Sequence, residues 1–164
     1  MKEQLEHVEK TGPIFKTIPL HLRGPPPKKH STLTDLPKTF NQRKIDSSPG
    51  AIVVTEKVAP FRIVSVNPAW EQLCGFTHEE SVGKTLSILQ GPETDRAAIT
   101  SMLSQMLKGE EVGMELMNYD KSGRKFKNRL KLGSLRSEET NEITHFVGLL
   151  KEIEDSQEKK VAIN

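Results

Sequence analysis

The stretch VGMELMNYDKSGRKFKNRLKL (residues 112–132) alternates apolar and polar side chains on both sides of the polar sequence DKSG. In its second half, lysines and arginine take every second position, and mostly apolar residues take the positions between them. Successive side chains of a strand point to opposite faces of a sheet. The pattern therefore predicts two half-buried strands, over residues 112–119 and 124–132, rather than a helix.

The polar sequence between these strands predicts a hairpin. A three-residue loop over 121–123 joins them, and the glycine at its end supplies the positive φ that such loops use. This loop length pairs Asn118 with Phe126 and Leu116 with Asn128. The register keeps the apolar faces of both strands on one side of the sheet.

Two asparagines break the apolar face of this hairpin. Asn118 and Asn128 occupy positions where the alternation requires an apolar side chain. A buried primary amide without partners costs on the order of 1–3 kcal/mol, so each must form hydrogen bonds. Either each amide bonds a loop backbone or its neighbour, or both amides address a ligand with donor and acceptor edges.

The remaining elements follow from local patterns. A helix is expected after Asn67, which is suited to capping it, and a second short helix follows the capping box of Thr77 and Glu80. Apolar residues at three- and four-residue spacing predict a longer amphipathic helix over 95–108. Runs of β-branched and apolar residues predict three more strands, at residues 51–55, 61–66 and 142–153.

The distribution of charge and proline divides the chain into three parts. Residues 1–45 hold nine Lys/Arg against four Asp/Glu and six prolines, and they predict a basic, mostly disordered arm. Residues 46–153 form the predicted domain, and residues 154–164 form a polar tail. Beyond residue 45 the chain holds fifteen basic against eighteen acidic residues, a balance that does not suggest a nucleic-acid groove.

Composition also narrows the class of protein. The single cysteine, Cys74, excludes an intramolecular disulfide and a multi-cysteine metal site. No apolar run approaches the roughly 20 residues that span a bilayer, and no nucleophile motif, zinc spacing or phosphate-binding loop occurs. We expect a soluble, cytoplasmic or nuclear protein that is not an enzyme and binds neither a metal, nor nucleic acid, nor a membrane.

Four segments carry a resemblance to a known family. The chain over about residues 48–153 resembles the LOV (light-oxygen-voltage) branch of the PAS domains. The resemblance implies an α+β PAS fold, in which short helices and one longer helix pack on one face of a five-stranded antiparallel sheet. The matching segments are NPAWEQLCGF (67–76), LQGPETDR (89–96), MNYDKSGRKFKN (117–128) and ITHFVGLL (143–150).

The resemblance implies a flavin pocket at specific residues. Asn118 and Asn128 match the two asparagines that hold the polar edge of the flavin ring in LOV domains, and Gln90 matches a third polar residue of the pocket. Thr85 stands where the family has an asparagine, and it retains a hydrogen-bonding group. These four residues are the candidate cofactor contacts.

Other pocket positions depart from the family. Leu86 stands at the position of the cysteine that forms the photochemical adduct, and Leu150 stands at the position of the glutamine that relays the signal. Ser87 and Leu103 replace two arginines that hold the flavin phosphate. The adduct cannot form at Leu86, and the charge-assisted contacts to phosphate are absent from those two positions.

Two functions remain open on these residues. One is a LOV-like PAS module without adduct photochemistry, which acts through association with a signalling protein or a second copy. Its pocket is empty, filled by side chains or occupied by an adventitious ligand, so that no cofactor is required. The other is a sensor that binds FMN, another flavin or a small planar ligand through Asn118, Asn128 and Gln90, and responds by flavin photoreduction without an adduct.

Overall fold

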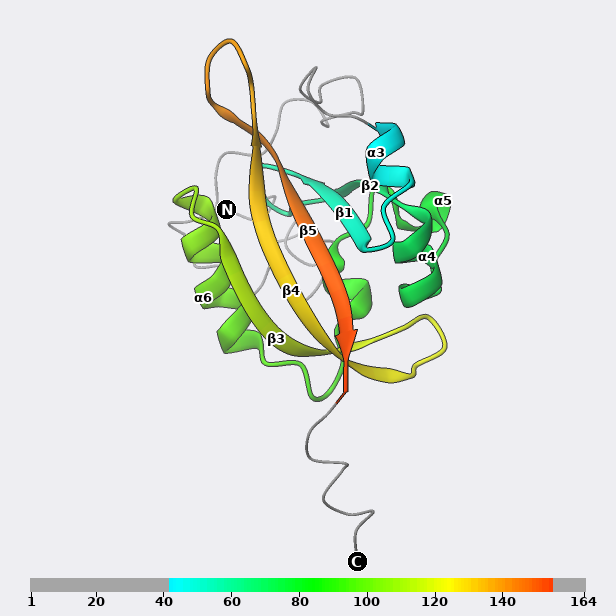
Figure 1. Cartoon of the computed structure of the whole chain (residues 1–164). Helices are drawn as coiled ribbons and strands as arrows, with labels where there is room; N and C mark the ends of the chain where they lie inside the picture. Colours follow the sequence, from blue (N-terminus) through cyan, green and yellow to red (C-terminus); the bar gives the residue numbers. More distant parts are fainter. Residues whose placement is uncertain (1–41, 155–164) are drawn as a thin grey trace, which may run out of the picture.

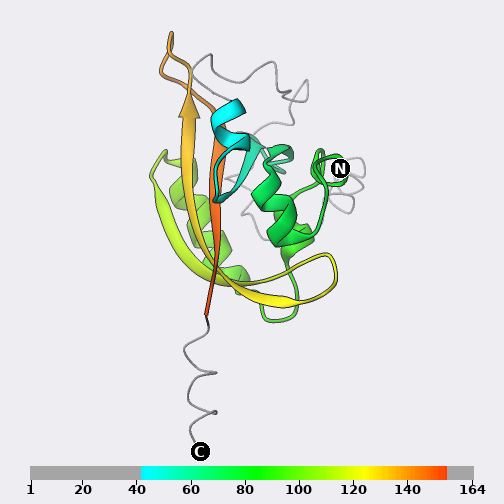
Figure 2. The same cartoon turned by 45° about the vertical axis from the view of Figure 1, so that its right-hand side comes forward.

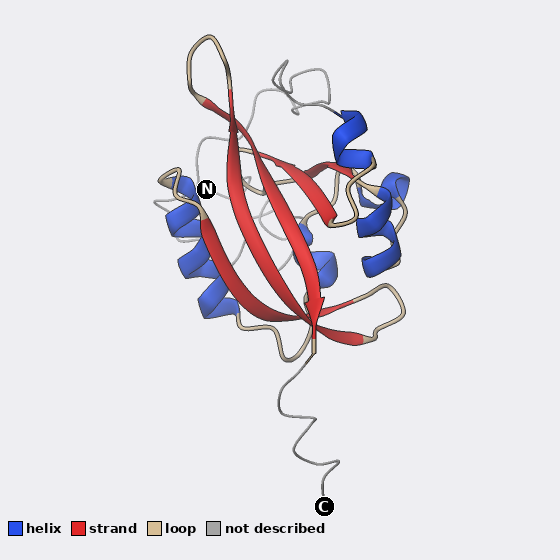
Figure 3. Cartoon of the chain, viewed as in Figure 1, coloured by secondary structure: helices blue, strands red, loops and turns tan. Residues whose placement is uncertain are grey.

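The computed structural model describes residues 42–154, in which five antiparallel strands form one sheet of order β2-β1-β5-β4-β3 (Figure 1; Figure 3). This confirms the predicted α+β fold. The last strand pairs with the first strand on one side and with the fourth strand on the other. It therefore joins the N-terminal and C-terminal parts of the domain. The elements are α3 (Gln42–Asp46), β1 (Ala51–Glu56), β2 (Ile63–Val66), α4 (Pro68–Cys74), α5 (His78–Ser81), the 3₁₀ helix η3 (Leu86–Leu89), α6 (Arg96–Leu107), β3 (Val112–Tyr119), β4 (Lys125–Arg136) and β5 (Ile143–Ile153).

The hairpin of β3 and β4 has the predicted register. Asn118 pairs with Phe126, and Leu116 pairs with Asn128. The loop closes with a bond of 3.0 Å from the backbone N–H of Asp120 to the carbonyl of Arg124, and its glycine has a φ of 86°. The alternation in the sequence therefore determined which side chains of both strands face the interior.

Two strand boundaries differ from the prediction by two residues or more. β4 extends to Arg136 instead of ending at residue 132, because β5 pairs with it as far as that residue. β2 begins at Ile63 instead of residue 61, since Phe61 has a φ of 59° and takes the chain out of the extended conformation. Both differences depend on the path of the chain in three dimensions, which residue type alone does not report.

Helix α3 spans the boundary that the sequence analysis places between the arm and the domain. It begins inside residues 1–45, which the composition assigns to a mostly disordered segment. The carbonyl of Ile45 accepts a hydrogen bond of 2.9 Å from Nδ2 of Asn67, which ties the end of this helix to the domain. The rest of the arm and the tail from residue 155 lie outside the described residues.

Asn67 joins three parts of the chain as well as capping α4. Its Oδ1 accepts from the backbone N–H groups of Trp70 at 3.0 Å and Ile52 at 2.8 Å. Its Nδ2 donates to the carbonyls of Ile45 at 2.9 Å and Gly50 at 2.8 Å. The side chain is fully buried, so the amide satisfies four backbone groups within one junction.

The long helix α6 lies behind the β3–β4 side of the sheet in Figure 1, and the turned view of Figure 2 separates the sheet from the helices. Asp95 caps the helix by accepting from the N–H of Ala98 at 2.9 Å. The predicted capping box of α5 is also present. The core lies between the helices and one face of the sheet, and α6 contributes to it Ile99, Met102, Leu103 and Met106.

Candidate functional site

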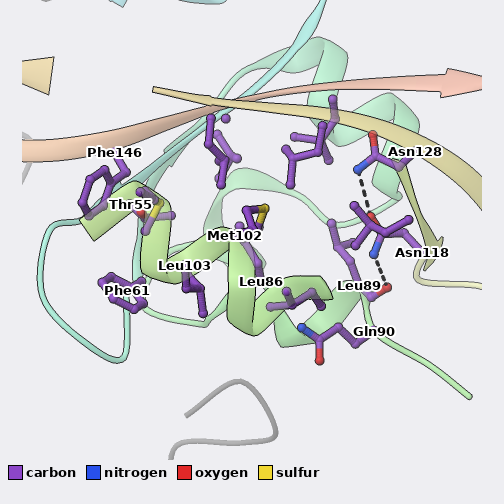
Figure 4. A pocket seen from close by; sticks show the side chains of 18 of the residues that line it. Thr55, Phe61, Leu86, Leu89, Gln90, Met102, Leu103, Asn118, Asn128 and Phe146 are labelled. Atoms are coloured by element: carbon purple, nitrogen blue, oxygen red, sulfur yellow. Dashed lines mark hydrogen bonds between the residues drawn. The ribbon is translucent and has the colours of Figure 1, made fainter. Parts of the chain in front are cut away.

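A cavity of about 70 Å³ lies between the sheet, α6 and η3 (Figure 4). Most of its wall is aliphatic, aromatic and methionine side chains. Four residues bring polar groups to the wall: Thr55, Gln90, Asn118 and Asn128. The cavity is therefore an apolar space in which polar contacts are confined to a few positions.

The two asparagines of the hairpin bond each other inside this wall. Nδ2 of Asn128 donates to Oδ1 of Asn118 at 2.9 Å, and Nδ2 of Asn118 donates to the carbonyl of Leu89 at 3.0 Å (Figure 4). Oδ1 of Asn128 accepts from the backbone N–H of Lys151 at 3.1 Å. This chain of bonds links β5, β4, β3 and η3.

The amides thus meet the demand for partners through the protein itself, the first of the two alternatives that the sequence left open. Each Nδ2 carries two hydrogens, and the bonds described engage one of them. Asn128 is fully buried and Asn118 nearly so. Each amide therefore keeps one N–H that these bonds do not use, and a ligand that reaches the cavity wall can accept a hydrogen bond from it.

Leucines occupy the cavity wall at three of the positions where the sequence departs from LOV domains. Leu86 on η3, Leu103 on α6 and Leu150 on β5 all line the cavity. Leu103 and Leu150 are buried. These side chains fill space with methyl groups and present no hydrogen-bonding group.

Thr85 and Gln90 lie at the two ends of η3. Thr85 is outside the cavity lining, and its Oγ1 lies 2.6 Å from Oγ of Ser87 and accepts from the N–H of the same residue. Gln90 lines the cavity, and its backbone N–H bonds the carbonyl of Ser87 at 3.0 Å. The structure therefore brings Gln90 together with Asn118 and Asn128, whereas Thr85 caps the helix. Their role as cofactor contacts stays a prediction.

Sequence reasoning did not assign Thr55 and Phe61 to the site. Thr55 on β1 and Phe61 before β2 both line the cavity, and Phe61 packs edge-on against Phe146 with ring centroids 6.1 Å apart. Alternation along residues 51–55 places Thr55 on the same face as Val53, which is a usable indication. The position of Phe61 depends on its positive φ, for which the sequence has no indication.

Hydrogen bonds of the segment GPET (91–94) hold the chain after η3 against the edge strand β3. Oγ1 of Thr94 donates to the carbonyl of Met117 at 2.7 Å and accepts from the N–H of Gly91 at 3.0 Å. The hydroxyl of Tyr119 accepts from the N–H of Glu93 at 3.2 Å. A Cβ on Gly91 would overlap the ring of Tyr119. The motif therefore positions the wall that carries the Leu89 carbonyl.

The cavity fits only part of a flavin. Its amides suit the polar edge of a planar heterocycle. Its volume of about 70 Å³ is far below the roughly 300–1,000 Å³ of sites that hold drug-sized ligands, so three fused rings enter only if wall side chains move. No lysine or arginine lines it, and Arg96 is exposed at the start of α6. A phosphate gains no charge-assisted contact from this wall.

Cys74 lies on α4, outside the cavity lining, and is fully buried. Burial, with a smaller contribution from the negative charge of Asp120, raises the pKa of its thiol to about 12. The thiolate is the reactive form of cysteine. The thiol is therefore inert at neutral pH, as expected for a small apolar core residue.

We expect a thiol-specific disulfide reagent at pH 8 to modify the folded protein about a thousandfold more slowly than the urea-unfolded chain. The reason is that the thiolate population rises steeply once Cys74 leaves the core. Stopped-flow absorbance in native buffer and in urea measures both rates. Rapid modification of the folded protein would mean that the thiol of Cys74 reaches solvent and is not confined to the core.

Two buried ionisable residues lie away from the cavity. Glu56 and His145 face each other across β1 and β5, and each is about 1% exposed. Phe146, the neighbour of His145 in the chain, lines the cavity, so His145 points to the opposite face, as the alternation predicts.

Within residues 42–154, no cluster of three metal-binding side chains occurs. The helices of that range are too short or too polar to cross a bilayer. The predicted compartment stays a prediction.

Comparison with known families and proteins gives consistent matches. A family model described as PAS domain matches residues 49–155, more than half of the chain. The chain is 34% identical over 98 residues to Phototropin-1A of Oryza sativa subsp. japonica, covering 59% of this chain and 10% of that protein. It is 35% identical over 98 residues to a blue-light-activated histidine kinase of Rhizobium johnstonii, and the match covers 59% of this chain and 28% of that protein. A blue-light photoreceptor of Listeria innocua is 29% identical over 107 residues, and the match covers 65% of this chain and 42% of that protein.

Solved structures agree with these relatives. A light-oxygen-voltage domain studied with a flavin analogue has a TM-score of 0.64 and 25% identity, covering 73% of this chain and 89% of that chain. The LOV domain of an Erythrobacter litoralis blue-light-activated histidine kinase has a TM-score of 0.60 and 27% identity, and the match covers 66% of this chain and 99% of that chain. The chain spans less than half the length of the curated relatives above. The similarity is therefore to a sensor domain.

Proposed function

The chain belongs to the PAS domain family, and on that basis we propose that it is a LOV-type sensor and interaction module that forms no cysteinyl adduct and signals through association with another protein. The LOV and blue-light photoreceptor relatives support the sensor class. One observation carries the rest. Leu86 lines the cavity at the position that matches the adduct-forming cysteine of LOV domains, whereas Cys74 lies outside the lining.

The cavity chemistry supports this proposal. A cysteinyl adduct requires a cysteine sulfur beside the ligand, and the side chain of Leu86 offers carbon and hydrogen only. Leu150 pairs with Leu130 and Ala51 in the two neighbouring strands, so on the cavity side it transmits a change by packing and not by a hydrogen bond. A sensor module needs no catalytic residue of its own; the prediction that the whole protein is not an enzyme remains part of this proposal.

A second candidate function is non-covalent binding of FMN or another planar ligand. The observation that favours it is the amide pair of Asn118 and Asn128, which keeps unused hydrogens at the cavity wall. Light would then act by photoreduction of the flavin. We consider Trp70 and Tyr119 as electron donors for this reduction, and both lie outside the cavity lining.

Reconstitution with FMN tests the proposed function. We expect the native chain to form no flavin adduct, seen as bleaching that recovers in the dark without oxygen, because no thiol lines the cavity. If the native chain takes up flavin, Leu86→Cys should bleach and recover in the dark, since it restores the nucleophile. Leu86→Ala is the matched control, which opens similar space without a thiol. Absorbance after gel filtration measures uptake and bleaching.

Each outcome separates the candidates. Bleaching of the native chain that recovers in the dark without oxygen contradicts the absence of an adduct. Bleaching that recovers only in air supports the second candidate, because a photoreduced flavin needs an oxidant to return. A stoichiometric band that does not bleach shows binding without photoreduction, and a colourless protein after supplementation removes the second candidate. Flavin-loaded Leu86→Cys that fails to bleach would show that the wall around residue 86 has diverged in geometry as well as in residue type.

A further inference from the structure

A second concavity lies on the outside of the domain. It is a groove of about 890 Å³ between α4, residues 49–51 at the start of β1, and strands β4 and β5. Its strand side carries Arg129, Lys131, Leu149 and Lys151. These residues point away from the cavity, because their neighbours Leu130 and Leu150 line it. We call this concavity the basic groove.

Leu149 is the exposed apolar residue of the basic groove. It is 45% exposed, one of two large hydrophobic residues with that degree of exposure among residues 42–154. Leu73 and Ala69 of α4 line the facing wall. An exposed leucine set among apolar and aliphatic groups offers a contact that water does not satisfy.

The charges around Leu149 are not balanced. Lys131 is the direct cross-strand partner of Leu149 and Lys151 lies two residues along β5. Neither lysine has an ion pair with any residue of the described chain. Arg129 is 2.8 Å from a carboxylate oxygen of Glu115, which is also 3.4 Å from Lys127. Glu152 also lines the groove, and its carboxylate is 2.6 Å from Arg124. Three cations and one carboxylate therefore line the groove, and it attracts negative charge.

The sheet topology decides the form of the partner. β4 and β5 are interior strands, but β5 pairs with β1 only up to Leu150 and with β4 up to Ile153. The last three residues of β5 therefore have no partner strand on the β1 side. This edge is shorter than the about five or six residues of an ordinary strand, so it does not favour strand addition at the groove. Recognition has to come from side chains, as when the apolar stripe of an amphipathic helix lies in a groove.

A second copy of the chain is a poor occupant. A two-fold symmetric contact through the groove sets the same patch against itself. It would bring Arg129, Lys131 and Lys151 of both copies together. The carboxylate that each copy adds is Glu152, which is already paired with Arg124, and like charges at an interface oppose association. The charge pattern therefore favours a different protein with acidic side chains.

We propose that the basic groove binds an acidic amphipathic helix of a partner protein, with an apolar residue of that helix on Leu149 and its carboxylates on Lys131, Lys151 and Arg129. This inference rests on the proposed role in protein association and names the chemistry of the partner. It concerns a surface separate from the cavity, so ligand binding in the cavity is not required for it.

A synthetic peptide tests the groove in the full-length chain. The probe is a stapled helical peptide of about 18 residues, long enough for a stable helix, with a leucine stripe flanked by glutamates. Titration into ¹⁵N-labelled protein should shift amide signals of residues 149–151 and 69–73. The double variant Lys131→Glu/Lys151→Glu should lower the affinity by about tenfold or more, and Leu149→Ala by about fivefold.

The matched control is Lys84→Glu/Lys108→Glu, which makes the same change of charge at exposed lysines outside the groove. It should bind the peptide as the native chain does. A scrambled peptide of the same composition should bind about tenfold more weakly, since its apolar side chains no longer form a stripe. Equal binding of the scrambled peptide, or an equal loss in the control variant, overturns the proposal.

Other occupants are outcomes of the same experiment. Phosphatidylserine vesicles or duplex DNA that bind through Lys131 and Lys151 while the peptide does not would overturn the proposal in favour of a phosphate surface. Self-association that the double variant abolishes, measured by sedimentation, would overturn it in favour of a second copy. Peptide binding is measured without flavin, so its failure is distinguishable from a failure of the cavity chemistry.

Discussion

Replacement of Asn67 by leucine is expected to lower the free energy of unfolding by about 3–5 kcal/mol. The substitution keeps the approximate volume of the side chain and removes four hydrogen bonds. The backbone N–H groups of Ile52 and Trp70 and the carbonyls of Ile45 and Gly50 all lose their partner. The two donors are buried, so each retains its full desolvation cost, whereas water reaches the carbonyls more easily.

Urea unfolding followed by fluorescence measures this loss, because Trp70 is the single tryptophan and is fully buried. Asn67→Ser should fall between the two proteins, since a hydroxyl still caps α4 but does not reach all four groups. Pro68→Ala, at an exposed neighbouring position, should cost less than about 1 kcal/mol. A loss below about 1 kcal/mol in Asn67→Leu would show that this junction does not stabilise the domain as argued.

Gly91→Ala is the second large effect, with an expected loss of about 1–3 kcal/mol. A Cβ at this position overlaps the ring of Tyr119, and the ring has to leave its place. Its hydroxyl then loses the bond from the N–H of Glu93. We expect the segment from η3 to α6 to loosen, and amide hydrogen exchange in residues 89–95 to accelerate together with the loss of stability.

A double-mutant cycle assigns the cause. In a Tyr119→Ala background the overlap is gone, so Gly91→Ala should cost less than about 0.5 kcal/mol more. Gly113→Ala is the matched control on β3, because its Cβ meets nothing closer than 4.0 Å. If Gly91→Ala is equally costly with and without the Tyr119 ring, the clash is not the reason that glycine occupies this position.

Local patterns were sufficient for much of the fold. The period-two alternation of the β3–β4 hairpin predicted its register, and the cap of α4 and the capping box of α5 lie where the residue types indicated. These features depend on neighbours within about ten residues. The extra length of β4 and the presence of α3 were not predictable in the same way, since both depend on contacts with distant segments.

The candidate site was predictable in its members but not in its arrangement. The structure places Asn118, Asn128, Gln90, Leu86 and Leu150 around one cavity, and the role of the three polar residues as cofactor contacts stays a prediction. It places Thr85 at a helix cap instead. It also adds Thr55 and Phe61, which come from the opposite end of the sheet, where no local motif marked them.

The sequence by itself determined the alternation of buried and exposed side chains and the absence of a thiol at residue 86. Those properties belong to single residues and to the geometry of a strand. The tertiary structure alone decided that the asparagines bond each other and the Leu89 carbonyl, that the cavity is about 70 Å³, and that Lys131, Lys151 and Leu149 share an outer groove. The reason is that these contacts join segments up to dozens of residues apart, and only the packed sheet and helices set the distances between them.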